Sequence, residues 1–339
     1  MERLFRDLVD WIEIPSVTGD EESYGDALSR ALSEKGFDVE RQEVEPGRYN
    51  ILARAGVPEV VFCTHLDTVP PFFGSSTDSE FIRGRGSCDA KGQAATMLAA
   101  AERLLAGGED RIGFLFTVGE EVDSAGAAFA NAHLAEPWAP RFVIVGEPTE
   151  STFVAAHKGI YKARLVAEGV AGHSSQDVGP SAVHELVECA GKLLGEAWGR
   201  HDVLGEGTLN IGRITGGVAA NVVAEHAEAD VLIRTVEPPT AVEARLKSHL
   251  CDGVRLEGAF KCFGPVEFHV PEGERSTTVA FGTDAPHMPR WGTPLLFGPG
   301  SILDAHTDHE QVKKRELIVC VERHVATVKG LLARAESRA

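Results

Sequence analysis

Residues 60–67 read VVFCTHLD, and the rest of the chain can be interpreted outward from them. The first five residues form a short apolar run with β-branched and aromatic side chains, which predicts a buried strand over 60–64. His65 and Asp67 follow at the point where this strand ends. Strands that are apolar throughout are typical of parallel sheets, whose ligands bind beyond the carboxyl ends of the strands. The stretch therefore predicts an α/β protein with its chemistry at this strand end.

Helical and extended patterns alternate on both sides of this strand. We expect two amphipathic helices before residue 36, helices over 94–105, 124–134 and from 310 to about 335, and strands over 112–118, 142–145 and 294–297. Such alternation predicts a mainly parallel sheet flanked by helices on both faces.

Residues 155–271 have a different character. Longer alternating strands, expected over 161–168, 207–214 and 224–236, surround helices over 181–194 and 240–250. The order strand, helix, strand, strand, helix, strand is typical of a small ferredoxin-like α+β domain. We therefore expect a catalytic, metal-binding domain made of residues 1–154 and 272–339, with residues 155–271 inserted as a second, smaller domain.

Composition narrows the classes of function. The chain has 339 residues, a net charge of −18 and 43% hydrophobic residues, as expected for a soluble globular protein of about two domains. No apolar run approaches the roughly 18 to 20 residues that cross a bilayer, and acids occupy the N-terminus where a secretory signal is apolar. The negative charge disfavours nucleic acid, and the six cysteines contain no CxxC pair. We expect a cytoplasmic protein with neither a membrane nor a nucleic-acid partner.

Side chains of the metal-ligand types follow each expected strand of the larger domain. They are His65 and Asp67, Glu120 and Glu121, Glu147, and His306; a further carboxylate, Asp89, lies at the entry to the helix expected over 94–105. Taken singly, Asp89 could cap a helix, His65 could be a core histidine, and Glu120 could lie in a solvated loop. Together they would crowd like charges at one rim, which is costly unless cations compensate. Two divalent ions would do so, and mixed histidine and carboxylate ligands suit zinc or cobalt better than magnesium.

Four motifs resemble the dinuclear zinc deacylase and exopeptidase family, which includes acetylornithine deacetylase, succinyl-diaminopimelate desuccinylase, aminoacylase and the glutamate-releasing carboxypeptidases. The motifs are THLDTV at 64–69, GRGSCDAKG at 84–92, the pair Glu120-Glu121, and GEPT at 146–149. The resemblance runs over nearly the whole chain. It implies a zinc-exopeptidase-like fold and gives the inserted domain the role of a lid and dimerisation domain.

The resemblance also assigns ligands for two Zn²⁺ ions, with Co²⁺ as an alternative. His65, Asp89 and Glu147 would hold one ion, and Asp89, Glu121 and His306 the other, so that Asp89 bridges. Asp67 would orient the imidazole of His65. Members of the family also tend to have a cis peptide bond after the bridging aspartate, here Asp89-Ala90.

The expected reaction is attack on an amide carbonyl by a hydroxide that bridges the two ions, with Glu120 as the general base. Alternatively, Glu120 only adds negative charge around the ions. By resemblance, His173 in the inserted domain stabilises the oxyanion, across a homodimer in the relatives. Asn221 and Arg234 match positions that bind the substrate's carboxylate, and Thr283 is a further candidate; Arg234 could instead form a surface ion pair.

Several segments are most similar to acetylornithine deacetylase. They include GEPT at 146–149, HKG at 157–159, GHSS at 172–175, GTDAP at 282–286 and GPGSI at 298–302. The first expectation is therefore hydrolysis of a small N-acyl amino acid, N-acetylornithine, to ornithine and acetate. Succinyl-diaminopimelate, a carrier-linked or other N-acyl amino acid, and a dipeptide are alternatives on the same scaffold. A binding protein derived from a retired hydrolase would lack one of these residues, and none is missing.

Overall fold

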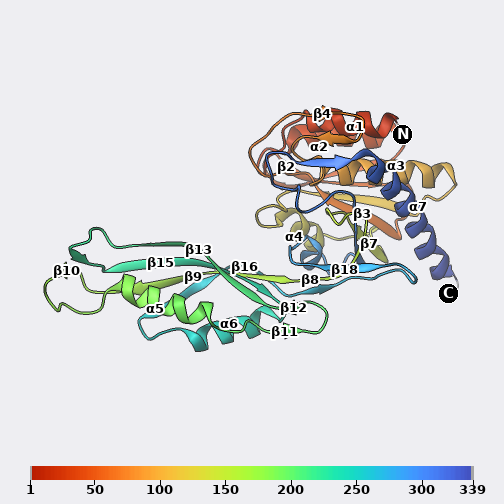
Figure 1. The fold of residues 1–339 in the computed structure, drawn as a ribbon. Helices are drawn as coiled ribbons and strands as arrows, with labels where there is room; N and C mark the ends of the chain where they lie inside the picture. Colours follow the sequence, from red (N-terminus) through yellow and green to blue (C-terminus); the bar gives the residue numbers. More distant parts are fainter. Residues whose placement is uncertain (1, 337–339) are drawn as a thin grey trace. The chain divides into compact units, whose positions relative to one another are not determined.

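The computed structural model describes residues 2–336 and divides into two compact units, each with its own hydrophobic core (Figure 1). Unit 1 contains Met1–Ala155, Phe268–Thr277 and Thr283–Ala339. Unit 2 contains Ala156–Glu267 and Thr278–Gly282. Within the described residues, no helix is long and apolar enough to cross a membrane.

Unit 1 is built on a six-stranded sheet in the order β1-β2-β6-β3-β7-β19. Its strands are β1 Asp38–Glu45, β2 Arg48–Arg54, β6 Ile112–Thr117, β3 Val60–His65, β7 Phe142–Val145 and β19 Thr293–Leu296. The last four run parallel, with β3 between β6 and β7. The predicted α/β class is thereby confirmed.

The other two strands make the sheet mixed, which the sequence analysis did not foresee. β1 and β2 form an antiparallel hairpin, and β2 continues antiparallel onto β6. β1 reads DVERQEVE, and every one of its residues is at least partly exposed. A solvated edge strand has no apolar run, and so the signal that identifies β3 is missing here.

Helices cover both faces of this sheet. On one face α1 (Glu2–Ile12), α3 (Lys91–Ala106) and α7 (Lys314–Glu336) pack together, and the ring of Phe62 on β3 contacts His324 of α7. On the other face the Cys63 thiol lies 3.9 Å from the sulfur of Met288, next to the short helix η1 (Ala285–His287). α2 (Glu22–Glu34) packs on β2, and α4 (Ala125–Ala132) contacts β1, β2 and η1.

The expected helix start at residue 310 is wrong. Residues Gln311–Lys313 form a strand, β20, that pairs with β5 (Phe81–Arg83), and α7 begins only at Lys314. β4 (Ser76–Thr77) completes this small sheet. The side chain of Val312 is buried opposite Ile82. Pairing with a strand that is distant in sequence therefore outweighs the helical pattern over these residues.

Unit 2 contains a four-stranded antiparallel sheet in the order β13-β15-β9-β16. Its elements follow the chain as β9 Gly159–Glu168, α5 Ala182–Leu194, β13 Thr208–Gly216, β15 His226–Thr235, α6 Pro239–His249 and β16 Val254–Phe263. This is the order of helices and strands expected from the sequence. α5 packs on β9 and β15, and α6 packs on β9 and β16.

Short strands complete the described chain. They are β8 Phe153–His157, β10 Gly172–His173, β11 Arg200–His201, β12 Gly205–Glu206, β14 Val222–Val223, β17 Val266–Glu267 and β18 Ser276–Val279.

Candidate metal site and active site

The parallel strands of unit 1 bring the candidate ligands to one edge of the sheet. β3 ends on His65, the turn that holds Glu120 and Glu121 follows β6, and Glu147 follows β7. The loop that contains His306 follows β19. Because the four strands are parallel, their carboxyl ends lie together, and so do the side chains that follow them.

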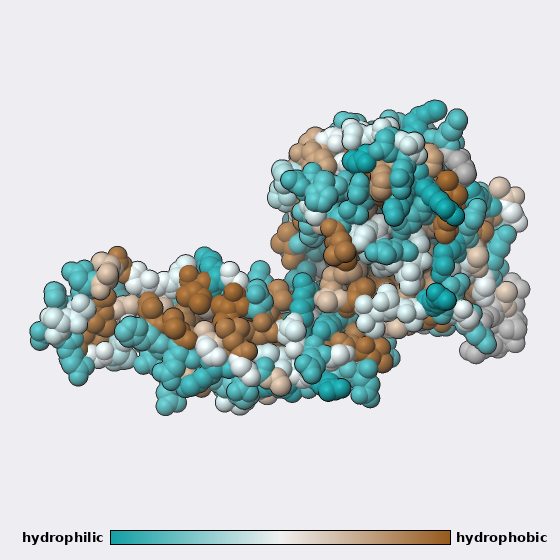
Figure 2. All heavy atoms as spheres, in the orientation of Figure 1, coloured by the Kyte–Doolittle hydropathy of each residue, from teal (hydrophilic) through white to brown (hydrophobic). Residues whose placement is uncertain are grey.

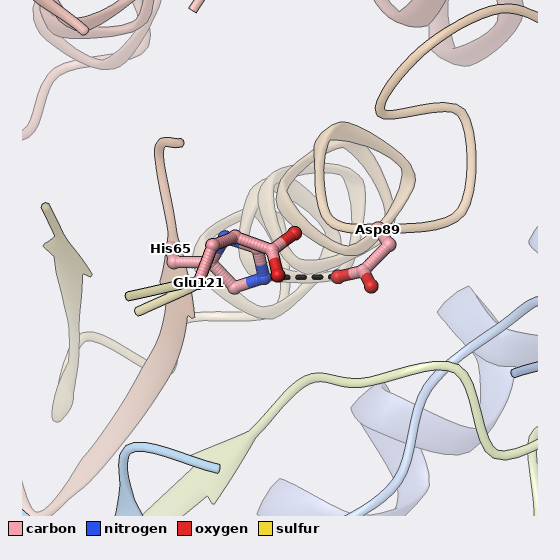
Figure 3. Close-up of side chains that lie close together, drawn as sticks. All are labelled: His65, Asp89 and Glu121. Carbon is pink, nitrogen blue, oxygen red and sulfur yellow. Dashed lines mark hydrogen bonds and ion pairs between the residues drawn. The ribbon is translucent and has the colours of Figure 1, made fainter. Parts of the chain in front are cut away.

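Asp89 lies at the centre of this group, just before α3. Its Oδ1 is 2.9 Å from Nε2 of His65, and its Oδ2 is 3.3 Å from Nε2 of His306. Nε2 of His306 is also 3.0 Å from a carboxylate oxygen of Glu121. Ligand atoms of His65, Asp89 and Glu121 all lie within 4.8 Å of one another (Figure 3). Each oxygen of Asp89 thus faces a different histidine, as the carboxylate of a bridging ligand would.

The tautomer of His65 is set by the backbone. Its Nδ1 lies 2.9 Å from the carbonyl oxygen of Asp67, which can only accept a hydrogen bond. Nδ1 therefore carries the proton in the neutral ring. The lone pair of Nε2 is left facing Asp89, where a metal ligand needs it.

Asp67 is fully buried and holds two ligand-bearing segments at once. Its carboxylate accepts the backbone N–H groups of Glu120, at 3.1 Å, and Glu121, at 3.2 Å. It also accepts the Thr18 hydroxyl at 2.8 Å, and one oxygen lies 3.4 Å from Nδ1 of His65. Although burial acts in the opposite direction, these hydrogen bonds lower the pKa of Asp67. The residue thus orients the Glu120-Glu121 turn as well as His65.

The site carries more negative charge than its histidines compensate. Burial raises the pKa values of Glu120, Glu121 and Glu147, and neighbouring carboxylates add to the effect. Hydrogen bonds with Asp89 and Glu121 raise the pKa of His306 to about 10, against the effect of burial. Buried carboxylates that repel one another, beside histidines that can give up a proton when a metal ion binds, are the donor set of a divalent-cation site. The residues present therefore fit the two metal ions that the sequence motifs imply.

His306 reaches the cluster from a constrained loop. Its backbone has a φ of 62°, in the left-handed region that few residues other than glycine adopt. The loop begins at Gly298, where an added Cβ would lie 1.8 Å from the side-chain oxygen of Gln93. The amide nitrogen of Gln93 donates to the carbonyls of Cys88, at 2.8 Å, and Pro299, at 2.7 Å. Gln93 thereby ties the loop before Asp89 to the loop before His306.

Three of the predicted residues belong to unit 2. His173 lies on β10, which pairs with β14 directly after Asn221, and the carbonyl of Asn221 accepts the N–H of Ser174 at 3.1 Å. Nδ1 of His173 accepts the N–H of Ser175 at 3.2 Å. In the neutral ring the proton is therefore on Nε2, which leaves His173 able to donate a hydrogen bond to an oxygen.

Arg234 lies on β15, opposite Thr208 and Ile160. It is half-buried, and this burial lowers the pKa of its guanidinium. Within residues 2–336 no carboxylate pairs with it, unlike Arg164 and Arg213 on the same sheet, which both pair with Asp230. The alternative that Arg234 forms a surface ion pair therefore has no support in the described part of the chain.

Thr283 is buried in unit 1, where its hydroxyl accepts the N–H of Ala285 at the start of η1. The adjacent Asp284 is also buried, and one of its oxygens accepts the Thr117 hydroxyl at 2.7 Å. These contacts give Thr283 a part in shaping η1. A role in binding substrate stays a prediction.

Comparison with known proteins identifies the family. The sequence model of peptidase family M20/M25/M40 matches residues 61–330. The chain belongs to this family. A probable carboxypeptidase of Aspergillus flavus is 39% identical over 95% of the chain and 88% of that protein. A peptidase M20 domain-containing protein of Schizosaccharomyces pombe is 35% identical over 90% of the chain and 79% of that protein.

Solved structures of M20 peptidases and of other peptidases share the fold. Aminopeptidase PepT of Bacillus cereus matches with a TM-score of 0.81 and 21% identity, over 98% of both chains. A dinuclear metal-binding M20 peptidase of Bacillus subtilis matches with a TM-score of 0.68 and 15% identity, also over 98% of both chains.

In the present chain the Asp89-Ala90 peptide bond is cis, as predicted.

Two buried residues of this M20 site escaped the sequence analysis. Gln93 joins two ligand loops through contacts with residues far away in the sequence. Glu310 accepts hydrogen bonds from the backbone N–H groups of Cys88 and Asp89. The only local signal for Glu310 is that it is a carboxylate four residues after the candidate ligand His306.

Proposed function

We propose that this M20 peptidase is a metal-dependent exopeptidase of the carboxypeptidase or dipeptidase type. Its substrate would carry a free α-carboxylate next to the amide bond that is cleaved. The observation that carries the proposal is the arrangement around Asp89, whose two carboxylate oxygens face one histidine each. The names of the M20 relatives, above all the 39% identical probable carboxypeptidase, support a peptide substrate.

The ligands divide into two overlapping sets. His65, Asp89 and Glu147 would hold one divalent ion, and Asp89, Glu121 and His306 the other. When bound, such ions polarise the amide carbonyl and lower the pKa of the attacking water. Zinc is the first candidate and cobalt the second, because both accept mixed histidine and carboxylate ligands.

Glu120 is placed to move protons. Its backbone N–H is held by Asp67, and its carboxylate makes no hydrogen bond within the described residues. A carboxylate that is free of a structural partner, next to a metal ligand, can take a proton from the attacking water. It can then deliver that proton to the nitrogen of the leaving amine. We therefore propose Glu120 as the general base and acid.

Residues of unit 2 are proposed to bind the substrate. A half-buried guanidinium without a carboxylate partner, as in Arg234, suits the substrate's α-carboxylate, because its fork can pair with both oxygens. His173 would donate from Nε2 to the oxygen of the amide carbonyl as negative charge develops there. Asn221 is a further candidate for contact with the carboxylate. Whether His173 acts in its own chain or in a dimer partner depends on the oligomeric state.

N-acyl amino acids are the second substrate class, because they present the same amide bond and α-carboxylate. N-acetylornithine is a candidate within this class, because segments such as GTDAP at 282–286 are similar to acetylornithine deacetylase. A peptide ranks first because the two relatives reported above are named as a probable carboxypeptidase and as a peptidase M20 domain-containing protein.

A substrate panel tests the proposal. Protein reloaded with zinc or cobalt is assayed against dipeptides, tripeptides and N-acyl amino acids, N-acetylornithine among them. Each compound is paired with its C-terminal amide. We expect much faster cleavage of the free acids than of their amides, reversible loss of activity in chelator, and faster turnover of peptides than of N-acetylornithine. Equal cleavage of acids and amides, or activity that survives chelation, would contradict the proposal.

A further inference from the structure

Glu310 is a buried carboxylate in the segment that leads from His306 to β20. Its Oε1 accepts two backbone N–H groups, those of Cys88 and Asp89, each at 3.1 Å. Its Oε2 accepts Nη1 of Arg85 at 2.7 Å. Both oxygens are thus occupied by donors from the loop that carries the central aspartate.

Arg85 is held rigidly in its turn. It is 1% exposed, its Nε donates to the carbonyl of Pro71 at 3.2 Å, and its guanidinium lies 5.0 Å from the ring centre of Phe73. The backbone N–H of Gly84 also donates to the carbonyl of Glu310 at 3.1 Å. The segment at Glu310 is therefore joined to both ends of the loop over 84–89.

We propose that Glu310, supported by Arg85, is the positioning residue for the carboxylate of Asp89. Two consecutive N–H groups that share one acceptor oxygen fix the orientation of two peptide planes, and with them the direction in which the Asp89 side chain leaves the backbone. The inference rests on the proposed function, since it takes Asp89 as the bridging metal ligand.

The same contact also sets the position of His306. Glu310 lies four residues after His306, so its attachment to the Asp89 loop holds the two loops against each other. Nε2 of His306 and Oδ2 of Asp89 lie 3.3 Å apart at that junction. Glu310 would thus assemble two ligands of one metal ion without touching the metal itself.

The decisive variant is Glu310→Gln. The amide oxygen of glutamine can replace only one carboxylate oxygen, and its NH₂ group must then face either Arg85 or the two backbone donors. We expect a loss of about 10- to 100-fold in affinity for at least one metal ion, measured by titration against a chromogenic chelator. The visible absorption of the Co²⁺-loaded protein should change as well, and kcat should fall more than KM rises.

Two further variants separate positioning from general damage. Glu102→Gln removes a carboxylate that pairs with Lys35 near the opposite end of α3, and it should leave the metal titration and the cobalt spectrum unchanged. Arg85→Lys keeps a positive charge beside Glu310, and it should lose less metal affinity than Glu310→Gln. Wild-type metal affinity and a wild-type cobalt spectrum in Glu310→Gln would overturn the proposal, even if that variant unfolds more easily.

Hydrogen exchange tests the idea in the unaltered protein, in case Glu310→Gln does not fold. The amides of Cys88 and Asp89 should be protected equally in metal-free and metal-loaded protein, because Glu310 holds them in both states. Exchange at the unprotected rate in the metal-free protein would contradict the inference. These readouts are independent of the substrate, so a protein that binds metal normally and cleaves no peptide would contradict only the proposed function.

Discussion

Among single residues, Glu120 separates the chemistry from metal binding. If Glu120 takes the proton from the attacking water, Glu120→Gln lowers kcat by at least about 100-fold while the metal content stays at the wild-type level. If it only adds charge around the ions, the loss is small. Steady-state kinetics together with metal analysis distinguish the two, and Glu40→Gln, on the exposed edge of β1, serves as the control. Retention of most activity by metal-loaded Glu120→Gln would refute the role.

The variant Arg234→Ala tests the proposed recognition of the substrate's α-carboxylate. Arg234→Ala should raise KM by about tenfold or more for substrates with a free α-carboxylate, since it removes a charge-assisted pair. The weak hydrolysis of the matching amides should not change. Arg255→Ala, which changes an exposed arginine on β16 of the same sheet that pairs with Glu168, should leave KM as it is. An unchanged KM in Arg234→Ala would show that the carboxylate binds elsewhere.

His324 makes stability depend on pH, independently of the active site. It is fully buried between Phe62 and Phe297, and within the described residues neither ring nitrogen has a hydrogen-bond partner. Burial and the charge of Arg323 lower its pKa to about 3. Because the unfolded chain binds this proton near pH 6.5, the contribution to stability is full above that pH and is lost as the pH falls toward the folded pKa.

The quantity to measure is the slope of the unfolding free energy against pH. His324 should contribute up to about 1.4 kcal/mol of unfolding free energy per pH unit in that window. Urea unfolding of His324→Leu, followed over the same window, should show a flatter dependence than the wild type. His133→Gln, at an exposed position, should keep the wild-type slope. Parallel slopes for wild type and His324→Leu would show that this histidine does not stay neutral in the fold.

Between elements, contacts at the junction of β6 and α4 support both ends of the turn that carries Glu120. Asn50 on β2 accepts the N–H of Val118 and donates to the carbonyl of Gly126, which joins β2, the end of β6 and the start of α4. A Cβ at Gly126 would lie 2.5 Å from the nitrogen and 2.6 Å from the oxygen of Val118. Because these neighbours are backbone atoms, they cannot rotate away.

Gly126→Ala should therefore lower the free energy of unfolding by about 1 to 3 kcal/mol, the usual range for overpacking. Gly330→Ala is the matched control. It also lies in a helix, α7, but its Cβ would meet no atom within 4 Å, so the change should stabilise by about 0.5 to 1 kcal/mol. Thermal and urea unfolding of both variants give the comparison. A neutral Gly126→Ala would mean that α4 can move away from β6 at little cost.

For the whole molecule, we expect a homodimer formed through unit 2. β13 is an outer strand of the four-stranded sheet, and its free edge can pair with another strand. Ile214 and Val218, on and just beyond β13, are 49% and 85% exposed. Figure 2 shows further apolar residues on the visible face of this unit. Isologous pairing of two copies would cover both the edge and these side chains.

Sedimentation at micromolar concentration should give about twice the mass of the 36.3 kDa chain. The double variant Ile214→Asp and Val218→Asp should sediment as a monomer, because it places charge on the edge. Val57→Asp, at an apolar position of unit 1 whose exposure lies between those of Ile214 and Val218, should remain dimeric. A wild-type protein that sediments as a monomer would contradict both the dimer and any action of His173 from a partner subunit.

The local sequence was sufficient to predict those strands and site residues whose positions depend on neighbouring residues in the chain. The apolar runs of β3 and β7 must be buried, so they predict strands, and in a parallel sheet the residues that follow them share one edge. His65, Glu121 and Glu147 could be placed by this reasoning, and the motif around Asp89 added the centre of the site. The edge strand β1 could not be foreseen, because it is stabilised by pairing with β2 rather than by an apolar run of its own.

Contacts between segments that are distant in the sequence could be found only from the tertiary structure. Glu310 meets Asp89 across 221 positions of sequence, and Gln93 meets Pro299 across 206. Nothing in either neighbourhood distinguishes these residues from ordinary polar side chains, because their roles depend on which backbone groups the fold leaves without partners. Residue types and their spacing thus predicted the candidate metal ligands, whereas packing alone selected the residues that hold those side chains in place.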